Sequence, residues 1–456
     1  MFVELPAHVQ GQQQTDIDQT LSRLGGADAP AKVSAAIQKL FDKSGTDFSS
    51  QVEPWLGQKL GIVLTQLPNG SNPSAAGIAI VAPTSDPSAA RAFIQADAKR
   101  LEGLGDSATV VGHYAIVGGA LAYPATVAAA SGSGASLADD NYYRTAVSTV
   151  GGDPDASMWV NAPAIERVLT SSATGGSALG AQLEKELGKV PAGSGEYLAL
   201  TLTPTAMRLD TYAGGLASRT GAAAGSAPDA GALPANSWLA LSTGSRGLGP
   251  SLQRNFASGF RIGMASEASE LGASPLAARQ LQMLTSVLQQ VGMALGPFSL
   301  SLGGTSPLAI TAGFEMKSPD AKAAGGLVAE LESLVSRSAH VTGNSKAFSI
   351  RLPTGQSVSL TNAAGKIVAI YGFASQRAFL DPTSTLAGTS LYRQAVSQLN
   401  SGSSVPLFVS FAPIAALVEL GDHQSSAAKT VAVLRKLSYL IVGTHAHEEQ
   451  VVLGFS

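Results

Sequence analysis

Short segments rich in apolar residues and bounded by turn-forming residues recur along the chain and predict β-strands. In the first half of the chain these segments are 1–5, 59–65, 75–81, 108–111, 114–117, 157–161, 195–203 and 207–212. In the second half they are 238–242, 298–302, 308–316, 348–352, 357–360, 367–371, 407–411 and 450–455. Turn-forming connections between neighbours, such as residues 68–73, favour antiparallel hairpins.

Apolar residues spaced three and four positions apart predict helices between these strands. One such stripe, in residues 275–291, consists of Leu281, Leu284, Leu288 and Val291. Further helices are predicted at 16–24, 31–41, 86–102, 124 onward, 141–150, 163 onward, 320 onward and 413 onward. The combination predicts an α+β protein with mostly antiparallel sheets and helices packed on them.

One stretch of sequence occurs twice. Residues 136–147 read SLADDNYYRTAV and residues 385–396 read TLAGTSLYRQAV, an offset of 249 positions (385 − 136). The identical positions in the first copy are Leu137, Ala138, Tyr143, Arg144, Ala146 and Val147. We therefore predict two homologous tandem repeat units, residues 1–214 and 233–456. Residues 215–232 are predicted to be a linker, because Gly, Ala and Ser bury too little apolar surface to order it.

The two predicted units differ at their starts. Unit 2 has residues 233–237 ahead of its first strand, whereas unit 1 begins at the strand itself. We therefore expect the N-terminus to be truncated, with an upstream segment such as a membrane anchor. The sequence given holds no run of about 18 apolar residues, and its longest apolar stretch, 114–130, is interrupted by Gly118, Gly119 and Pro124. That stretch is predicted to be a strand, a turn and a helix, so the chain itself has the pattern of a soluble protein.

Composition excludes several classes of function. The charged fraction is 13% and the net charge is −3, so no basic field is available to bind nucleic acid. The chain has no cysteine, which excludes disulfides, thiolate catalysis, zinc–cysteine sites and iron–sulfur clusters. No cofactor is predicted.

Several short motifs together resemble a known family. They are Val52-Glu-Pro-Trp-Leu-Gly57, the helix start Asp86-Pro87, Ser136-Leu-Ala with Tyr143-Arg144, and Val160-Asn-Ala-Pro163. In these motifs the chain resembles the domain-of-unknown-function 3352 family, uncharacterised bacterial proteins that are frequent in actinobacteria. Members often carry one N-terminal membrane helix with the bulk of the protein outside the cytoplasm. The resemblance implies an exported, membrane-anchored location and supplies no activity or catalytic residues; the chain departs from the pattern in lacking the anchor.

Two residue pairs are candidates for binding. His445 and His447 are two positions apart, so on a strand both imidazoles would share one face and could hold a metal ion. The alternative is a solvated turn, because no third ligand is evident. Tyr143-Arg144 and Tyr392-Arg393 could bind a carboxylate or phosphate through Arg. The alternative is that each Tyr fills the core while Arg pairs locally.

Trp55 and Trp159 could be ligand platforms, but a Trp beside a turn or within a strand is more often a core residue. Gly244–Gly249 only loosely resembles a phosphate loop, because the Lys-Ser/Thr ending is missing. Asp139-Asp140 is a carboxylate pair that the second copy replaces by Gly388-Thr389, which favours a surface loop over acid–base catalysis. No Gly-x-Ser-x-Gly nucleophile motif occurs.

The sequence therefore favours a non-enzymatic, extracytoplasmic and cell-envelope-associated binding or scaffolding protein, whose partner or ligand it does not identify. Duplicated units can form a groove in which a partner sits. A carrier of a lipid or another apolar ligand is the alternative, and a hydrolase using a Ser or the His445/His447 pair is a third class. We expect contact with a membrane only through the missing anchor.

Overall fold

The computed structural model describes residues 1–7, 11–33, 35, 47–66, 77–101, 107–163, 194–214, 229–242, 297–304, 309–336, 340–344, 346–352, 355–421, 425–445 and 448–456. The predicted helix 275–291 and the glycine-rich segment 244–249 lie outside these residues, as do the turn 68–73 and most of the predicted helices 31–41 and 163 onward. The chain divides into two compact units. Unit 1 is residues 1–219 with 447–450 and 455, and unit 2 is residues 220–446 with 451–454 and 456.

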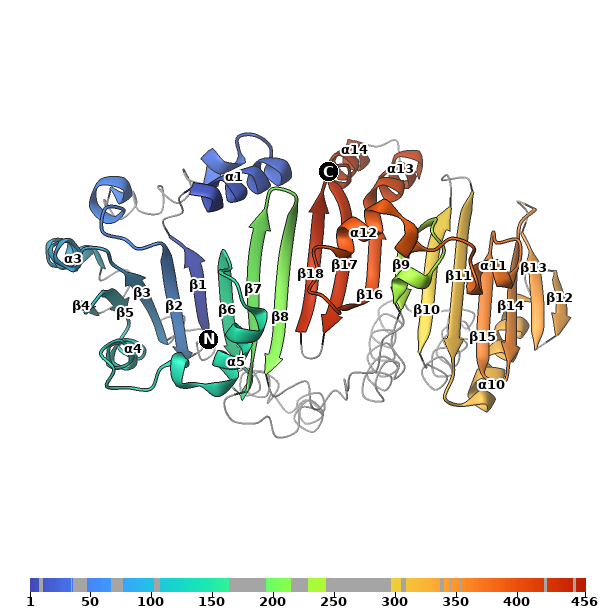
Figure 1. Ribbon diagram of the computed structural model, residues 1–456, viewed down its shortest axis with the longest axis horizontal. Helices are drawn as coiled ribbons and strands as arrows, with labels where there is room; N and C mark the ends of the chain where they lie inside the picture. The colour runs from blue at the N-terminus through green and yellow to red at the C-terminus, as the bar shows by residue number, and fades with distance from the viewer. Residues whose placement is uncertain are drawn as a thin grey trace, which may run out of the picture. The chain divides into compact units, whose positions relative to one another are not determined.

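Unit 1 is built on an antiparallel sheet (Figure 1). Hydrogen bonding places its strands in the order β4-β5-β3-β2-β1-β6-β7-β8. Their bounds are β1 Phe2–Pro6, β2 Lys59–Gln66, β3 Gly77–Pro83, β4 Ser107–Val111, β5 Tyr114–Gly118, β6 Ala156–Asn161, β7 Gly195–Thr203 and β8 Ala206–Gly214. The first strand of the chain therefore lies in the middle of the sheet, between β2 and β6.

Helices pack on this sheet and enclose two apolar clusters. The helices are α1 Gly11–Gly25, α3 Pro87–Leu101, α4 Tyr123–Ala130 and α5 Asn141–Val150, with a π-helical turn η1 Phe48–Val52 and a 3-10 turn η3 Leu137–Asp139. Helix α3 contacts β4 and β5, and one cluster gathers Trp55, Ile94 and Ala115 there. Helix α5 contacts β7 and β8, and the other cluster gathers Trp159 and Tyr197 beneath it.

Unit 2 has its own antiparallel sheet, in the order β12-β13-β14-β15-β11-β10-β9-β16-β17. The bounds are β9 Ser237–Ser242, β10 Phe298–Gly304, β11 Ile310–Lys317, β12 Val341–Asn344, β13 Ala347–Arg351, β14 Ser357–Ala363, β15 Lys366–Tyr371, β16 Ser404–Ser410 and β17 Leu437–His445, followed along the chain by β18 Glu448–Phe455. Its helices are α10 Ala321–Val335, α11 Gln376–Leu380, α12 Ser390–Val396, α13 Phe411–Gly421 and α14 Ser425–Leu434, with the 3-10 turns η4 Ala230–Ala232 and η5 Leu386–Gly388. As β1 does in unit 1, β9 lies between the next strand, β10, and the strand that follows the repeated stretch, β16.

The structure confirms an α/β protein with a large antiparallel sheet, and it confirms that 114–130 is a strand, a turn and a helix. One expectation is wrong. The end of the predicted linker is ordered, because Asp229 caps η4 through its hydrogen bond from the Gly231 amide and Ala230 is fully buried. Residues 215–228 lie outside the described part of the chain. Strand β12 and helices α11 and α14 were not predicted from the sequence.

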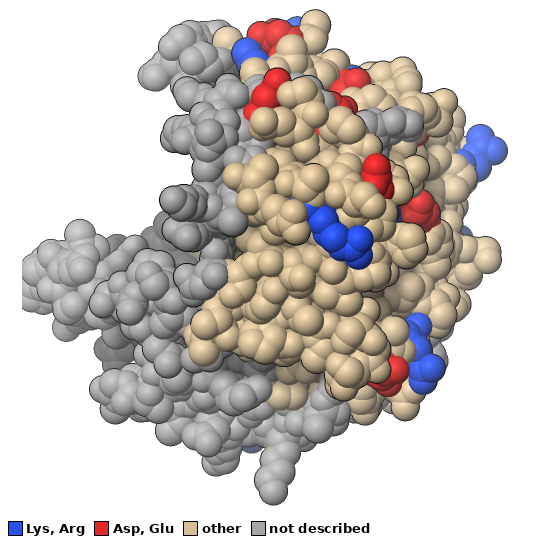
Figure 2. All heavy atoms as spheres, turned by 90° about the vertical axis from the view of Figure 1, so that its left-hand side faces the viewer, with Lys and Arg blue, Asp and Glu red and all other residues tan. Residues whose placement is uncertain are grey.

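Charged side chains are sparse on the face of unit 1 shown in Figure 2, and both signs occur there. This agrees with a charged fraction of 13% and a net charge of −3. No helix in the described part of the chain combines the length and the apolar character needed to cross a membrane.

Candidate functional site

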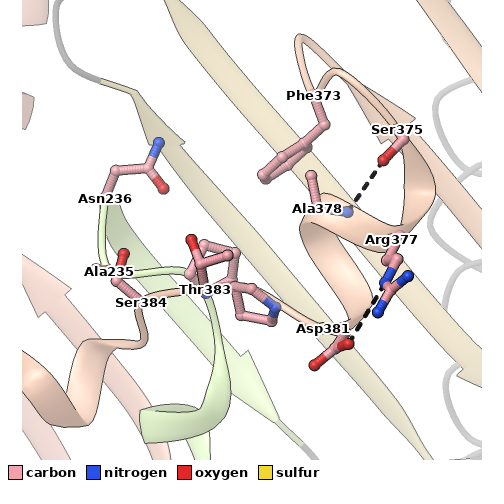
Figure 3. A pocket seen from close by; sticks show the side chains of 11 residues that line it. Ala235, Asn236, Phe373, Ser375, Arg377, Ala378, Asp381, Thr383 and Ser384 are labelled. Carbon is pink, nitrogen blue, oxygen red and sulfur yellow. Dashed lines mark hydrogen bonds and ion pairs between the residues drawn. The ribbon is translucent and has the colours of Figure 1, made fainter.

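A hollow of about 610 Å³ opens on the surface of unit 2 (Figure 3). We call it the unit 2 hollow. One side is the segment between η4 and β9, and the other is α11 with the residues on either side of it. The lining residues are Pro234, Ala235, Asn236, Phe373, Ser375, Arg377, Ala378, Asp381, Pro382, Thr383 and Ser384.

Backbone hydrogen bonds fix the first wall. The Ala235 amide donates to the Ser384 carbonyl at 3.0 Å, and the Leu386 amide donates to the Leu233 carbonyl at 2.9 Å. A turn between the Ser237 amide and the Pro234 carbonyl, 3.0 Å, then leads the chain into β9. The side chain of Asn236 is exposed on this wall (Figure 3), and the backbone carbonyl of Asn236 accepts a hydrogen bond from the Gly304 amide.

Two glycines shape the opposite wall. Gly372 has φ +72°, and a Cβ there would lie 2.4 Å from the Ile310 carbonyl oxygen, so the turn into Phe373 requires glycine. A Cβ on Gly313 would lie 2.3 Å from the ring of Phe379. Because Gly313 has none, Phe379 buries its ring against β11 and supports Phe373, whose ring centroid is 5.6 Å away.

Polar groups at the hollow carry no net charge. Arg377 and Asp381 are its ionisable lining residues, and they pair with each other at 3.6 Å while both stay well exposed. Ser375 caps α11 by accepting the Ala378 amide at 3.3 Å. The exposed side chains of Asn236, Thr383 and Ser384 make no hydrogen bond to any residue that the structure describes, so they are available to a ligand.

The tyrosines of the repeated stretch do not line the unit 2 hollow and pack against other aromatic rings. In unit 1, Tyr143 meets Trp159 edge-on at 5.6 Å and Tyr197 edge-on at 6.1 Å. Burial raises the pKa of Tyr143 to about 12. Arg144 is exposed and donates a hydrogen bond to Asn141 on its own helix. Among the described residues, Tyr143 therefore contacts core aromatic rings and Arg144 bonds within its own helix, and the two side chains do not form a binding site together.

In unit 2 the corresponding tyrosine has a further bond. Tyr392 is 3% exposed, meets Phe408 edge-on at 5.2 Å and donates its hydroxyl to the Asp229 carboxylate at 2.5 Å. Burial first, and then the bond to Asp229, raise the pKa of Tyr392 far above its usual value. Arg393 is exposed, with a hydrogen bond of 3.4 Å to the Thr389 carbonyl.

The two adjacent aspartates act as helix caps. Asp139 accepts the Ser136 amide at 3.0 Å and the Ser136 hydroxyl at 2.9 Å, and these bonds lower the pKa of Asp139. Asp140 caps α5 by accepting the amides of Tyr142 and Tyr143 at 2.8 and 3.1 Å. In unit 2, Thr389 caps α12 in the same way.

Both candidate tryptophans are core residues. Trp55 is buried, donates its indole N–H to the Gln51 carbonyl at 2.7 Å and packs on Phe93. Trp159 is 2% exposed inside the cluster beneath α5. Neither ring faces the unit 2 hollow, whose lining does not include them.

The histidine pair is only half described. His445 is exposed at the end of β17, with Nδ1 3.3 Å from the Gly402 carbonyl oxygen, and His447 lies outside the described residues. Within the described ranges no group of three or more His, Cys, Asp or Glu side chains is arranged to hold a metal ion.

None of the lining residues was singled out from the sequence, although the repeat contains a signal. At the offset of 249 positions, Phe373, Arg377, Asp381 and Thr383 align with Pro124, Ala128, Gly132 and Gly134. Unit 1 therefore lacks these four lining side chains at the aligned positions.

Comparison with known proteins places part of the chain in a family. Residues 12–112 match the model of the family described as "Protein of unknown function (DUF3352)". No curated protein and no solved structure matches the chain. The match confirms the resemblance found in the sequence: residues 12–112 are similar to the domain-of-unknown-function 3352 family.

Proposed function

We propose that this protein is a non-enzymatic binding protein and that the unit 2 hollow is its ligand site. The observation that carries the proposal is a hollow of about 610 Å³ whose exposed Asn236, Thr383 and Ser384 side chains have no bonding partner among the described residues. Ligand sites commonly have this size and combine an apolar wall with a few polar groups.

The chemistry of the lining favours binding over catalysis. Arg377 and Asp381 are the ionisable side chains there, and each is exposed and engaged with the other. An acid–base catalyst needs a group whose pKa is moved toward the working pH by burial or by a like charge. Arg377 and Asp381 form an exposed ion pair on the surface of the hollow, an arrangement typical of a structural contact.

We further propose that the two units are copies of one ancestral unit and that the protein acts outside the cytoplasm at the cell envelope. The common placement of β1 and β9 between their neighbours supports the first proposal. Resemblance to the family supports the second. Fractionation of the source cells with an antibody against the chain tests the location, and recovery in the cytoplasmic fraction alone would refute it.

A filled hollow tests the binding proposal. Ala235→Trp places an indole in the hollow, and Ala387→Trp is the matched control, because Ala387 is exposed on η5 outside the lining. The full-length wild type and both variants are incubated with a small-molecule extract of the source cell envelope, and mass spectrometry identifies what each retains. We expect a ligand that the wild type and Ala387→Trp retain and Ala235→Trp loses. Equal retention by all three, or by none, would refute the proposal.

A second hollow favours the carrier function as the other candidate. It has a volume of about 380 Å³, and its apolar lining includes Leu391, Ala412, Ala415, Ala416 and Leu437. Binding of a fluorescent fatty-acid analogue to the wild type but not to Ala416→Trp would support a carrier. No binding of the analogue to the wild type would exclude it.

A further inference from the structure

We propose that the ligand of the unit 2 hollow is a neutral carbohydrate, held by stacking on Phe373 and by hydrogen bonds to Asn236, Thr383 and Ser384. This inference rests on the proposed function, since it names the ligand class of that same site. It follows from the charge of the lining, its hydrogen-bonding groups and its aromatic wall.

The charge of the lining points to a neutral ligand. Arg377 and Asp381 have opposite signs and pair at 3.6 Å, so the lining residues that the structure describes present no surplus charge of either sign. A phosphate or carboxylate would meet Asp381 beside the one cation, and a cationic ligand would meet Arg377. Sites for such ions instead provide unopposed charge or several converging amides.

The hydrogen-bonding groups suit hydroxyls. An amide side chain offers both donors and acceptors, and each Ser or Thr hydroxyl can do either. Asn236 stands on one wall, with Thr383 and Ser384 between it and α11 (Figure 3). A sugar hydroxyl also donates and accepts, so it can satisfy any of these groups, whereas an apolar ligand would leave them without partners.

The aromatic wall suits the C–H face of a sugar ring. Phe373 lines the hollow, and the buried ring of Phe379 behind it holds it in place. The face of an aromatic ring carries negative partial charge and attracts the positively polarised C–H groups of a pyranose. Pro234 and Pro382 add rigid apolar surface to the lining of the hollow.

Lipids and extended peptides fit less well. The hollow is open and edged by exposed polar side chains, whereas an acyl chain needs an enclosed apolar cavity. A peptide that adds to a sheet edge needs unpaired backbone groups. On this wall the Ala235 amide, the Asn236 carbonyl and the Ser384 carbonyl are already paired.

Binding of sugars by the full chain tests this inference. The labelled wild type is applied to a printed glycan array and, in parallel, to a random hexapeptide array and to palmitate-containing vesicles. Calorimetry with the strongest glycan then compares the wild type with Asn236→Ala, Phe373→Leu and Asp381→Asn. The control is Glu419→Gln, which removes the exposed 2.7 Å ion pair with Arg435 at the second hollow.

We expect glycan binding that weakens about tenfold in Phe373→Leu, which keeps apolar volume but loses the ring, and severalfold in Asn236→Ala. Glu419→Gln should bind as the wild type does. If Glu419→Gln loses glycan binding while Asn236→Ala and Phe373→Leu bind as the wild type does, the assignment to this hollow is overturned. Hexapeptide or palmitate binding that Ala235→Trp abolishes, without glycan binding, would overturn the carbohydrate and keep the binding function. No binding on any of the three surfaces would overturn both.

Discussion

The tyrosine common to both copies of the repeated stretch should contribute differently to stability in the two units. Tyr392 donates its hydroxyl to the Asp229 carboxylate at 2.5 Å, whereas the Tyr143 hydroxyl makes no hydrogen bond to a described residue. Tyr→Phe removes only the hydroxyl and keeps the ring contacts. We therefore expect Tyr392→Phe to destabilise the protein and Tyr143→Phe to leave stability nearly unchanged.

The magnitude follows from the partners of Tyr392. A hydrogen bond to a charged group is worth about 1.5–3 kcal/mol. Asp229 is exposed, so water replaces part of the lost bond, and its bond from the Gly231 amide at 2.8 Å remains. We expect a loss of about 1–2 kcal/mol in the free energy of unfolding for Tyr392→Phe, and less than about 0.5 kcal/mol for Tyr143→Phe.

Chemical denaturation of the full chain and hydrogen exchange measured by mass spectrometry check this prediction together. Denaturation gives the free energy of unfolding, and exchange reports whether the peptide that contains η4 opens first. Tyr392→Phe should speed exchange around Gly231 and leave the peptides of α5 unchanged. Equal destabilisation by the two substitutions, or unchanged exchange at η4, would refute the reasoning that the Asp229 bond orders this segment.

Three further predictions follow from helix caps, close packing and burial. Asp140→Ala removes both capping bonds at the start of α5 and should lower the free energy of unfolding by about 1 kcal/mol. Asp140→Asn keeps a side chain that can cap the helix, so it should retain most of the stability. Equal stabilities of the two variants would contradict the capping role of Asp140. Gly313→Ala places a methyl group 2.3 Å from the Phe379 ring and should lower the melting temperature, with a loss of about 1–3 kcal/mol in the free energy of unfolding. Adding Phe379→Leu to this variant should recover part of that stability, and no recovery would refute the clash. Burial raises the pKa of Tyr143 from 10.0 to about 12, so above pH 10 the unfolded chain loses this proton while the folded chain keeps it. The stability contribution is complete below pH 10 and declines toward pH 12, and a denaturation series should show a smaller decline for Tyr143→Phe than for the wild type; equal declines would contradict the assignment.

Local sequence was sufficient for most strands and for several helix starts, including those of α3 and α5. Short apolar-rich segments next to turn-forming residues located both strands of the β2–β3 and β10–β11 pairs. It did not predict β12, whose sequence Val341–Asn344 is short, mostly exposed and contains Gly343. An edge strand of this kind is held by its pairing with β13 and not by an apolar face of its own.

Tertiary contacts decided the end of the predicted linker. Residues 229–232 lack large apolar side chains, so their sequence predicts no order. They are ordered because Tyr392, which lies 163 positions away in the sequence, donates its hydroxyl to Asp229. A sequence pattern with a window of about 11–18 residues contains no information on such a contact.

The sequence by itself determined that the chain combines helices with strands, where the repeated stretch lies and that its residues 141–150 form a helix, since helical spacing acts within a few positions of the chain. Only the tertiary structure decided where the unit 2 hollow, our proposed ligand site, is formed. The unit 2 hollow joins residues 234–236 to residues 373–384, and their proximity depends on the strand pairing and backbone bonds that place these distant segments side by side. Its walls depend on the absence of a side chain at Gly313 and Gly372, which becomes meaningful only when the neighbouring ring and carbonyl are in place.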